Sequence, residues 1–347
     1  MELALLELAG RLTDRDREVI RAVADHRVLT TGQICDLAFT SEVSTRHRLA
    51  VLAGLGVLAR FRPRLDRGSA PWHYVLDVLG AAVLAAEDDT DLDRVRVRRD
   101  KSLAIASSPR LAHLVGCNGF FTALTLSART TQSAVTAGTR GALWQGHLER
   151  WWSAQQVARK IGDLVRPDGY GRWREERLED ESQIEQAQEV WGSHAGGAVD
   201  FFVEYDTGTE NLNQLASKLT GYQKAAEWFA LDQDDRLPWL VFVFTRHGRE
   251  PGARRALNET ASVSARYGQI QLPIATGVFP GDEAGDRERN GDPAGPLWLP
   301  LETFAHLSAG ESSGWAYNKR LRLAQLPAVH PPAPVVNEPR VGMEDAW

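Results

Sequence analysis

The sequence predicts a mixed α+β or α/β chain of two domains: a small helical domain ending in a β-hairpin, and a larger α/β domain with a mixed β-sheet. Three observations predict this. A length of 347 residues suits two domains. Short helical patterns with capping residues fill the first 55 residues. Helical and strand patterns alternate from residue 147 onward, which is typical of an α/β layer structure.

Composition shifts mark the expected boundaries. The acidic stretch 87–91 follows the first domain, and five prolines follow Gln325. We therefore expect a first domain at 1–88, a linker and helix at 89–130, an α/β domain at 131–325 and a Pro-rich tail at 326–347.

The cysteines and the apolar segments indicate a cytoplasmic protein without membrane contact. Cys35 and Cys117 lie far apart and form neither a metal-binding spacing nor a disulfide framework. From the sequence, no apolar stretch is expected to approach the roughly 20 residues that span a bilayer. The apolar N-terminus carries two acids and no basic segment, unlike a signal peptide. The net charge of −6 excludes a uniformly basic surface but leaves local basic patches open.

Three short helices are expected in the first domain. Thr13 can cap a helix that ends near His26, and Thr30 or Thr31 can cap a second. Ser41 can cap a third helix, which continues to Leu55. Strands at 57–61 and 72–76 then enclose a basic hairpin with a turn at 66–68. This order is typical of a winged helix-turn-helix.

A winged helix binds DNA by inserting its third helix into the major groove while the hairpin contacts phosphate or the minor groove. The candidate DNA-binding residues are polar or basic side chains of these two elements: Ser44, Thr45, Arg46 and Arg48 on the helix, and Arg62, Arg64 and Arg67 on the hairpin. Two alternatives stay open. The domain could dock a protein, and the stem of Arg46 could cover apolar surface.

The second domain is expected to contain a helix at 147–160, a short apolar run at 164–170 and a strand at 198–205. Thr209 can cap a helix over 210–229. A continuous apolar strand at 240–245, a helix at 253–267 and a strand at 270–276 complete the pattern.

Three carboxylates are expected at one edge of this sheet. Asp168 and Glu204 fall at strand ends, and Asp206 shares a face with Glu204 because strand side chains alternate. Like charges so close repel one another unless they are protonated or bind a cation, and oxygen ligands suit Mg²⁺ or Mn²⁺. Lys218, on the following helix, can reach the same edge.

These residues resemble the PD-(D/E)xK phosphodiesterases. Pro167-Asp168 matches the first part of that motif and Glu204 its second acid, but Asp206 stands where the motif has lysine. Some members take the lysine from the neighbouring helix, which would make Lys218 the substitute, and Glu149 would match a further acid of the preceding helix. The resemblance implies a catalytic set of Asp168, Glu204, Asp206 and Lys218, with the three carboxylates as metal ligands.

Over 12–275 the chain also resembles the replication-relaxation family of actinobacterial plasmids and integrative elements. The resemblance rests on Leu12–Asp16, Arg166–Gly169 and Glu204–Thr209, with Lys218 and Tyr222 downstream. It implies a role in plasmid replication or in DNA relaxation before transfer, with origin DNA as the partner. A homodimer is a separate expectation for the assembly.

Four functions follow as hypotheses. The first is metal-assisted hydrolysis of DNA, and the second is covalent nicking through Tyr205 or Tyr222. The third is a non-catalytic initiator or accessory factor with a degenerate nuclease-like domain. The fourth is a transcriptional regulator, which would bind a palindromic duplex as a dimer.

Overall fold

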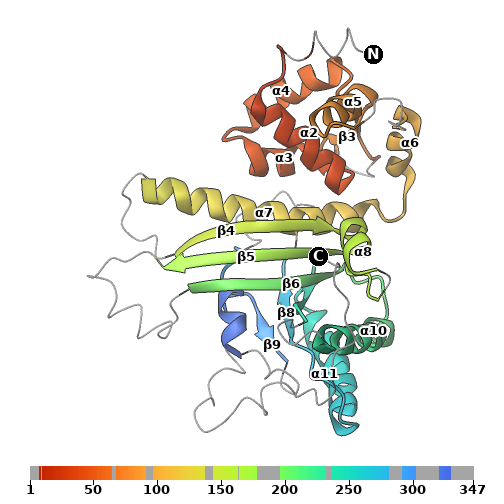
Figure 1. Ribbon diagram of the computed structural model, residues 1–347, viewed down its shortest axis with the longest axis vertical. Helices are drawn as coiled ribbons and strands as arrows, with labels where there is room; N and C mark the ends of the chain where they lie inside the picture. The colour runs from red at the N-terminus through yellow and green to blue at the C-terminus, as the bar shows by residue number, and fades with distance from the viewer. Residues whose placement is uncertain are drawn as a thin grey trace. The chain divides into compact units, whose positions relative to one another are not determined.

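The computed structural model describes residues 8, 10–64, 68–90, 97–136, 144–162, 164–177, 196–231, 237–280, 291–301 and 320–329. The fold is mixed α+β, as predicted, with a three-stranded and a six-stranded sheet in the described part (Figure 1). The chain divides into two compact units, Met1–Leu126 and Ser127–Trp347. The division falls inside one helix and within the segment 89–130 that was expected to be a linker and helix, and residues 97–126 belong with the first unit.

The first unit has the predicted element order. Its elements are α2 (Asp14–His26), β1 (Leu29–Thr30), α3 (Thr31–Ala38), α4 (Glu42–Gly54), β2 (Leu58–Phe61), β3 (His73–Leu76), α5 (Val78–Glu87), α6 (Arg99–Leu103), η2 (Ala104–Ser107) and the first part of α7 (Leu111–Thr136). The three strands form an antiparallel sheet in the order β1-β3-β2.

Capping boxes fix the starts of the first two helices. The Thr13 hydroxyl accepts a hydrogen bond from the backbone of Asp16, whose carboxylate accepts from the backbone of Thr13 in return. Thr30 and Gln33 form the same reciprocal pair at α3. Ser41 precedes α4 as predicted, but its side chain makes no capping hydrogen bond.

Helix α7 closes the first unit through polar contacts. Asn118 donates to the carbonyls of His26 at 3.1 Å and Val28 at 2.8 Å. Gln33 donates to the carbonyl of Val115 at 2.7 Å. The stretch Leu111–Ser133 is long and apolar enough to cross a membrane by length and composition, contrary to the sequence expectation. Packing supplies another reason for this composition, since Phe120, Phe121 and Leu124 are fully buried.

The second unit contains β4 (Trp144–Ser153), α8 (Ala154–Ile161), β5 (Gly169–Arg177), β6 (Gly196–Asp206), α10 (Leu212–Leu231), β7 (Trp239–Phe244), α11 (Glu250–Arg266), β8 (Ile274–Val278), β9 (Leu299–Pro300) and η5 (Leu323–Val329). The sheet order is β4-β5-β6-β7-β8-β9. β5 pairs antiparallel with both β4 and β6, whereas β6, β7 and β8 are parallel and joined through α10 and α11.

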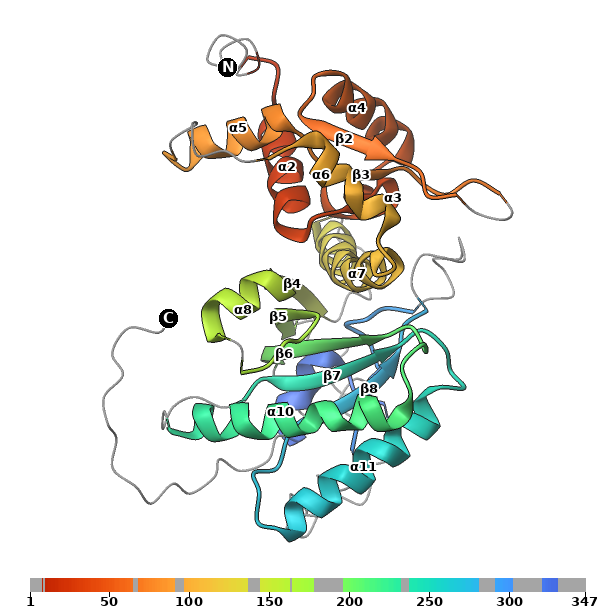
Figure 2. The ribbon, with the colours of Figure 1, turned by 90° about the vertical axis from the view of Figure 1, so that its right-hand side faces the viewer.

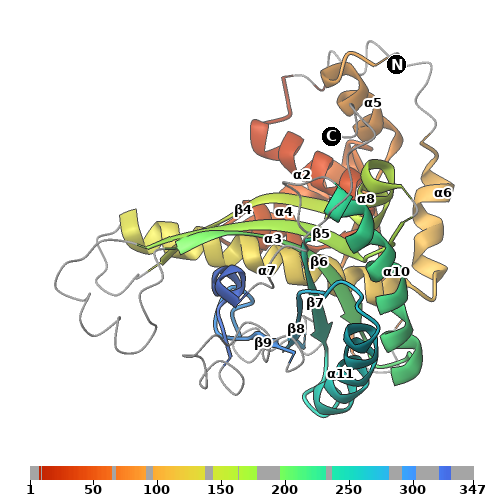
Figure 3. The same cartoon turned by 60° about the horizontal axis from the view of Figure 1, so that its bottom comes forward.

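The two faces of this sheet are covered differently. Helices α10 and α11 pack side by side on one face (Figure 2). Their core includes Phe202, Leu219, Phe242 and Leu257. On the other face η5 packs on β5 and β6, with Leu323 and Leu326 fully buried. Figure 3 shows β4 and β5 extending as a twisted ribbon beyond the shorter strands β7 and β8.

Two sequence expectations for this unit were wrong. Residues 147–153, expected to begin a helix, belong to edge strand β4, and the helix covers only 154–161. The predicted tail began at residue 326, yet η5 continues to Val329 with Leu326 in the core. The remaining tail residues, 330–347, lie outside the described residues.

Candidate functional site

Glu204 is a buried carboxylate near the carboxyl end of β6, on the face covered by α10. Its side chain is only 4% exposed. One carboxylate oxygen accepts from Lys218 Nζ at 2.9 Å, and the other accepts from the Tyr222 hydroxyl at 2.5 Å. Lys218 and Tyr222 are four residues apart on α10, so one helix face supplies both donors. Lys218 also pairs with Glu210 at 3.2 Å.

Asp168 lies beside Glu204 because it extends the pairing of β5 with β6 by one residue. Its backbone N–H donates to the Val203 carbonyl at 2.9 Å. Its carboxylate accepts from the Tyr205 backbone N–H, also at 2.9 Å. The structure thus brings together three of the predicted residues: Asp168, Glu204 and Lys218.

The charges of this cluster act on one another. Burial, together with the negative charge of Asp168, raises the pKa of Glu204 to about 7, although Lys218 and Tyr222 oppose the shift. Burial works against the charge of Lys218, but the carboxylates of Glu204, Asp168 and Glu210 outweigh it and raise the pKa of that amine. Burial and the nearby carboxylates also raise the pKa of Tyr222, so this residue remains a neutral hydrogen-bond donor.

Asp206, the third predicted carboxylate, has different partners. It shares the Glu204 face, but Arg249 Nε donates to one of its oxygens at 2.8 Å and the Gly208 backbone N–H to the other at 2.5 Å. Across the described residues, no group of three His, Cys, Asp or Glu side chains could hold a metal ion. The three-carboxylate arrangement expected from sequence is therefore not formed there.

Two other sequence assignments take new positions, and a third residue lies as expected. Glu149 lies on β4 and pairs with Arg172 at 2.8 Å and with Arg174. Asn211, not Thr209, caps α10 by accepting from the Gln214 backbone N–H at 2.8 Å. Tyr205 is buried on the face opposite Glu204, as alternation predicts.

Two of the four predicted groove residues on α4 are not available to a ligand. Thr45 is fully buried and donates to the Ser41 carbonyl at 2.8 Å. Arg48 donates to both oxygens of the buried Asp16 carboxylate, at 2.8 and 2.5 Å, and ties α4 to α2. Ser44 and Arg46 are exposed, and so is His47, which was not among the candidate DNA-binding residues.

The β2–β3 hairpin gathers cations around one indole ring. The guanidinium groups of Arg60 and Arg62 each lie 4.4 Å from the centre of the Trp72 ring. Arg62 also donates to the Ser69 hydroxyl at 3.1 Å, and Arg64 is exposed. Arg60 was not among the predicted DNA-binding residues, although it lies two residues before Arg62, a spacing that places side chains on one face of an extended chain. Arg67 lies outside the described residues.

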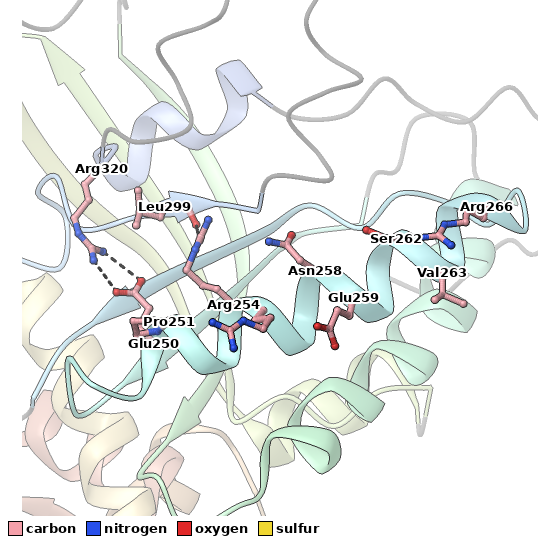
Figure 4. A pocket seen from close by; sticks show the side chains of 11 residues that line it. Glu250, Pro251, Arg254, Asn258, Glu259, Ser262, Val263, Arg266, Leu299 and Arg320 are labelled. Carbon is pink, nitrogen blue, oxygen red and sulfur yellow. Dashed lines mark hydrogen bonds and ion pairs between the residues drawn. The ribbon is translucent and has the colours of Figure 1, made fainter.

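A separate concavity of about 720 Å³ lies along α11 (Figure 4). Several side chains of its wall form hydrogen bonds and ion pairs within the protein. Arg320 pairs with the buried Glu250 at 2.6 Å, and Arg254 donates to the carbonyls of Leu299 at 2.7 Å and Pro300 at 2.9 Å. These contacts fasten the β9 segment to α11.

The family comparison covers both the hairpin and the acidic cluster. A model named replication-relaxation matches residues 20–236, more than half of the chain. The chain belongs to the replication-relaxation family. This membership points to a role in the replication or relaxation of plasmids and related elements. No curated protein and no solved structure matches the chain.

Proposed function

We propose that this replication-relaxation protein binds DNA through its first unit, as a winged helix in which the β2–β3 hairpin is the wing. The arrangement of Arg60 and Arg62 around Trp72 carries the proposal. An aromatic ring beneath two guanidinium groups restricts their motion, so less entropy is lost when they bind phosphate. Arg64 adds a third exposed cation. The exposed residues Ser44, Arg46 and His47 of α4 would contact the major groove.

The test measures binding of a short labelled duplex to the full chain by fluorescence anisotropy at several salt concentrations. We expect the variant R60A/R62A/R64A to bind more weakly and its salt dependence to fall by about 0.9 per lost phosphate contact. The control K101A/R110A removes two exposed cations of the same unit. Equal affinity and salt dependence in the hairpin variant and the native chain would refute this function.

A second function, phosphodiester hydrolysis, is favoured by the cluster of Asp168, Glu204, Lys218 and Tyr222. Asp168 and Glu204 fit a Mg²⁺ or Mn²⁺ ion, because such ions are commonly held by one or two carboxylates together with substrate phosphate. Asp206 belongs to a separate ion pair with Arg249 and also accepts from the Gly208 backbone N–H, so it is left out of the proposed ligand pair. The bound ion would supply an activated water and neutralise charge on the phosphate.

The chain's own residues prepare this chemistry. Tyr222 and Lys218 each fix one oxygen of Glu204, so the carboxylate is held in one orientation. The Tyr205 backbone N–H orients Asp168 in the same way. Lys218, about one-third exposed, is the cation best located to contact a phosphate oxygen.

The cleavage test uses supercoiled DNA and labelled single strands with Mg²⁺ or Mn²⁺, and with EDTA. We expect metal-dependent nicking that D168A, E204A and K218A each abolish and that D206N with R249Q leaves largely intact. Absent cleavage with intact duplex binding would reject hydrolysis and leave an initiator or accessory factor.

A further inference from the structure

We propose that the second unit carries its own DNA-backbone contact, on a surface formed by β4, α8 and the loop before Asp168. We call this surface the β4–α8 rim and define it by Arg150, Arg159, Lys160 and Arg166. All four side chains are exposed. The proposal rests on the second proposed function, because it identifies the path of the strand whose phosphate reaches Asp168 and Glu204.

Three of the rim cations, Arg150, Arg159 and Lys160, differ from several arginines of the same unit that have acidic partners. Arg172 pairs with Glu149 at 2.8 Å, Arg249 with Asp206 at 2.8 Å and Arg322 with Glu175 at 2.5 Å. Among the described residues, no carboxylate pairs with Arg150, Arg159 or Lys160. The only acid between residues 150 and 167 is Asp163, which lies outside the described residues.

Trp152 holds two of these cations in position. Lys160 Nζ lies 4.8 Å and the Arg150 guanidinium 5.8 Å from the centre of its ring. The ring itself stacks on Tyr170 with 4.5 Å between centroids. Because a cation over an aromatic face keeps its hydrogen-bond donors, both groups can still bind phosphate.

The rim lies close to the acidic cluster. Trp152 is opposite Tyr170 in the β4–β5 register, and Tyr170 is two residues after Asp168. Arg166 is two residues before Asp168. The Tyr170 ring is 5.8 Å from Phe202, and Phe202 is 6.1 Å from Tyr222, which donates to Glu204. The cations thus begin next to the carboxylates and continue along α8. DNA is the occupant that fits, since its evenly spaced phosphates match such a row of cations and one of them would meet Lys218.

The experiment removes the hairpin contribution first. The full chain with R60A/R62A/R64A is compared with the same chain carrying R150Q/R159Q/K160Q in addition. The matched control carries K224Q/R255Q/R266Q, three exposed cations of α10 and α11. Binding of labelled single-stranded and duplex DNA is followed by anisotropy at low and rising salt.

We expect the hairpin variant to retain weak DNA binding. The rim substitutions should abolish this residual binding or lower the slope of log affinity against log salt concentration by about 2, and the control substitutions should leave both unchanged. Two results would overturn the inference: no residual binding in the hairpin variant, or residual binding that the rim substitutions leave unchanged. Displacement of the DNA by poly-glutamate of equal charge would also overturn it. None of these outcomes bears on the hairpin proposal, which fails only if R60A/R62A/R64A binds like the native chain.

Discussion

Replacing Arg48 with alanine should destabilise the packing of α2 on α4, because Arg48 is a structural residue and not a DNA contact. The Asp16 carboxylate is 1% exposed and accepts two hydrogen bonds from Arg48 and two from Thr13. Burial disfavours the charge of Asp16, but the hydrogen bonds from Arg48 and Thr13 prevail and lower its pKa. Without Arg48, a buried carboxylate keeps its charge and loses its cation.

The magnitude follows from this burial. Removing one partner of a buried ion pair costs about 3–5 kcal/mol. Arg48 is itself 29% exposed, so water recovers part of that cost. We expect a loss of about 2–3 kcal/mol, which lowers the hydrogen-exchange protection of α2 and α4 roughly 30- to 150-fold.

The assay is amide hydrogen exchange of the full chain, read separately for peptides of each unit. The control R46A removes an exposed arginine whose pair with Glu42 is 3.2 Å long and exposed on both sides, so it should change stability by less than about 0.5 kcal/mol. The double variant D16N/R48A should be less destabilised than the sum of its single variants. If R48A keeps the native hydrogen-exchange protection but loses DNA binding, this reasoning is refuted and Arg48 is a DNA contact.

Three further outcomes are expected. Burial lowers the pKa of His26 to about 3. The unfolded chain then takes up a proton near pH 6.5 and the folded chain does not, so stability is full above pH 6.5 and falls by about 2 kcal/mol at pH 5. Urea titrations should show this slope reduced in H26Q, and an unchanged slope would contradict the assignment. A Cβ at Gly80 would meet the Val57 carbonyl oxygen at 2.2 Å, whereas one at Gly54 meets nothing within 4 Å. G80A should therefore lose about 1–3 kcal/mol in thermal unfolding and G54A should not; equal melting would refute the contact. Finally, Y222F should lower the affinity of Glu204 and Asp168 for Mn²⁺ in calorimetry while leaving the melting temperature within a few degrees. Unchanged Mn²⁺ binding would show that Tyr222 does not orient the carboxylate.

Local chemistry explains the elements that were predicted from sequence. Thr13 and Thr30 cap helices with partners three residues away, so a short window contains the whole interaction. The apolar run of β7 is buried on both faces, and its six residues are too short for a buried helix, so the sequence predicts a strand. Strand β4 was missed because its register shifts between Leu148 and Arg150. A bulge breaks the two-residue alternation and leaves apolar residues at a spacing that resembles a helix.

The candidate site was predicted where its residues share one strand or the next helix, and missed where they do not. Glu204 and Lys218 lie on strand β6 and the helix that follows it, whereas Asp168 precedes the antiparallel strand β5 and was assigned from the Pro167-Asp168 motif. The structure brings the three together. Arg249 binds Asp206 from 43 residues away, and Arg48 binds Asp16 from 32 residues away. No local pattern records such a partner, so a carboxylate that looks available in sequence can be already occupied.

The packing of η5 on β5 and β6 affects how the chain folds during translation. Arg322 meets Glu175 across 147 residues, and Leu323 and Leu326 cover a sheet face made much earlier in translation. A nascent chain halted before residue 320 would hold Glu175 without its arginine and would leave the face of β5 and β6 without η5. Such a chain is prone to aggregation through its exposed apolar surface. The first unit is a compact unit that ends at residue 126, so it can fold well before the second unit is complete. We therefore expect premature stop codons between 240 and 320 to yield insoluble protein whose first unit is folded.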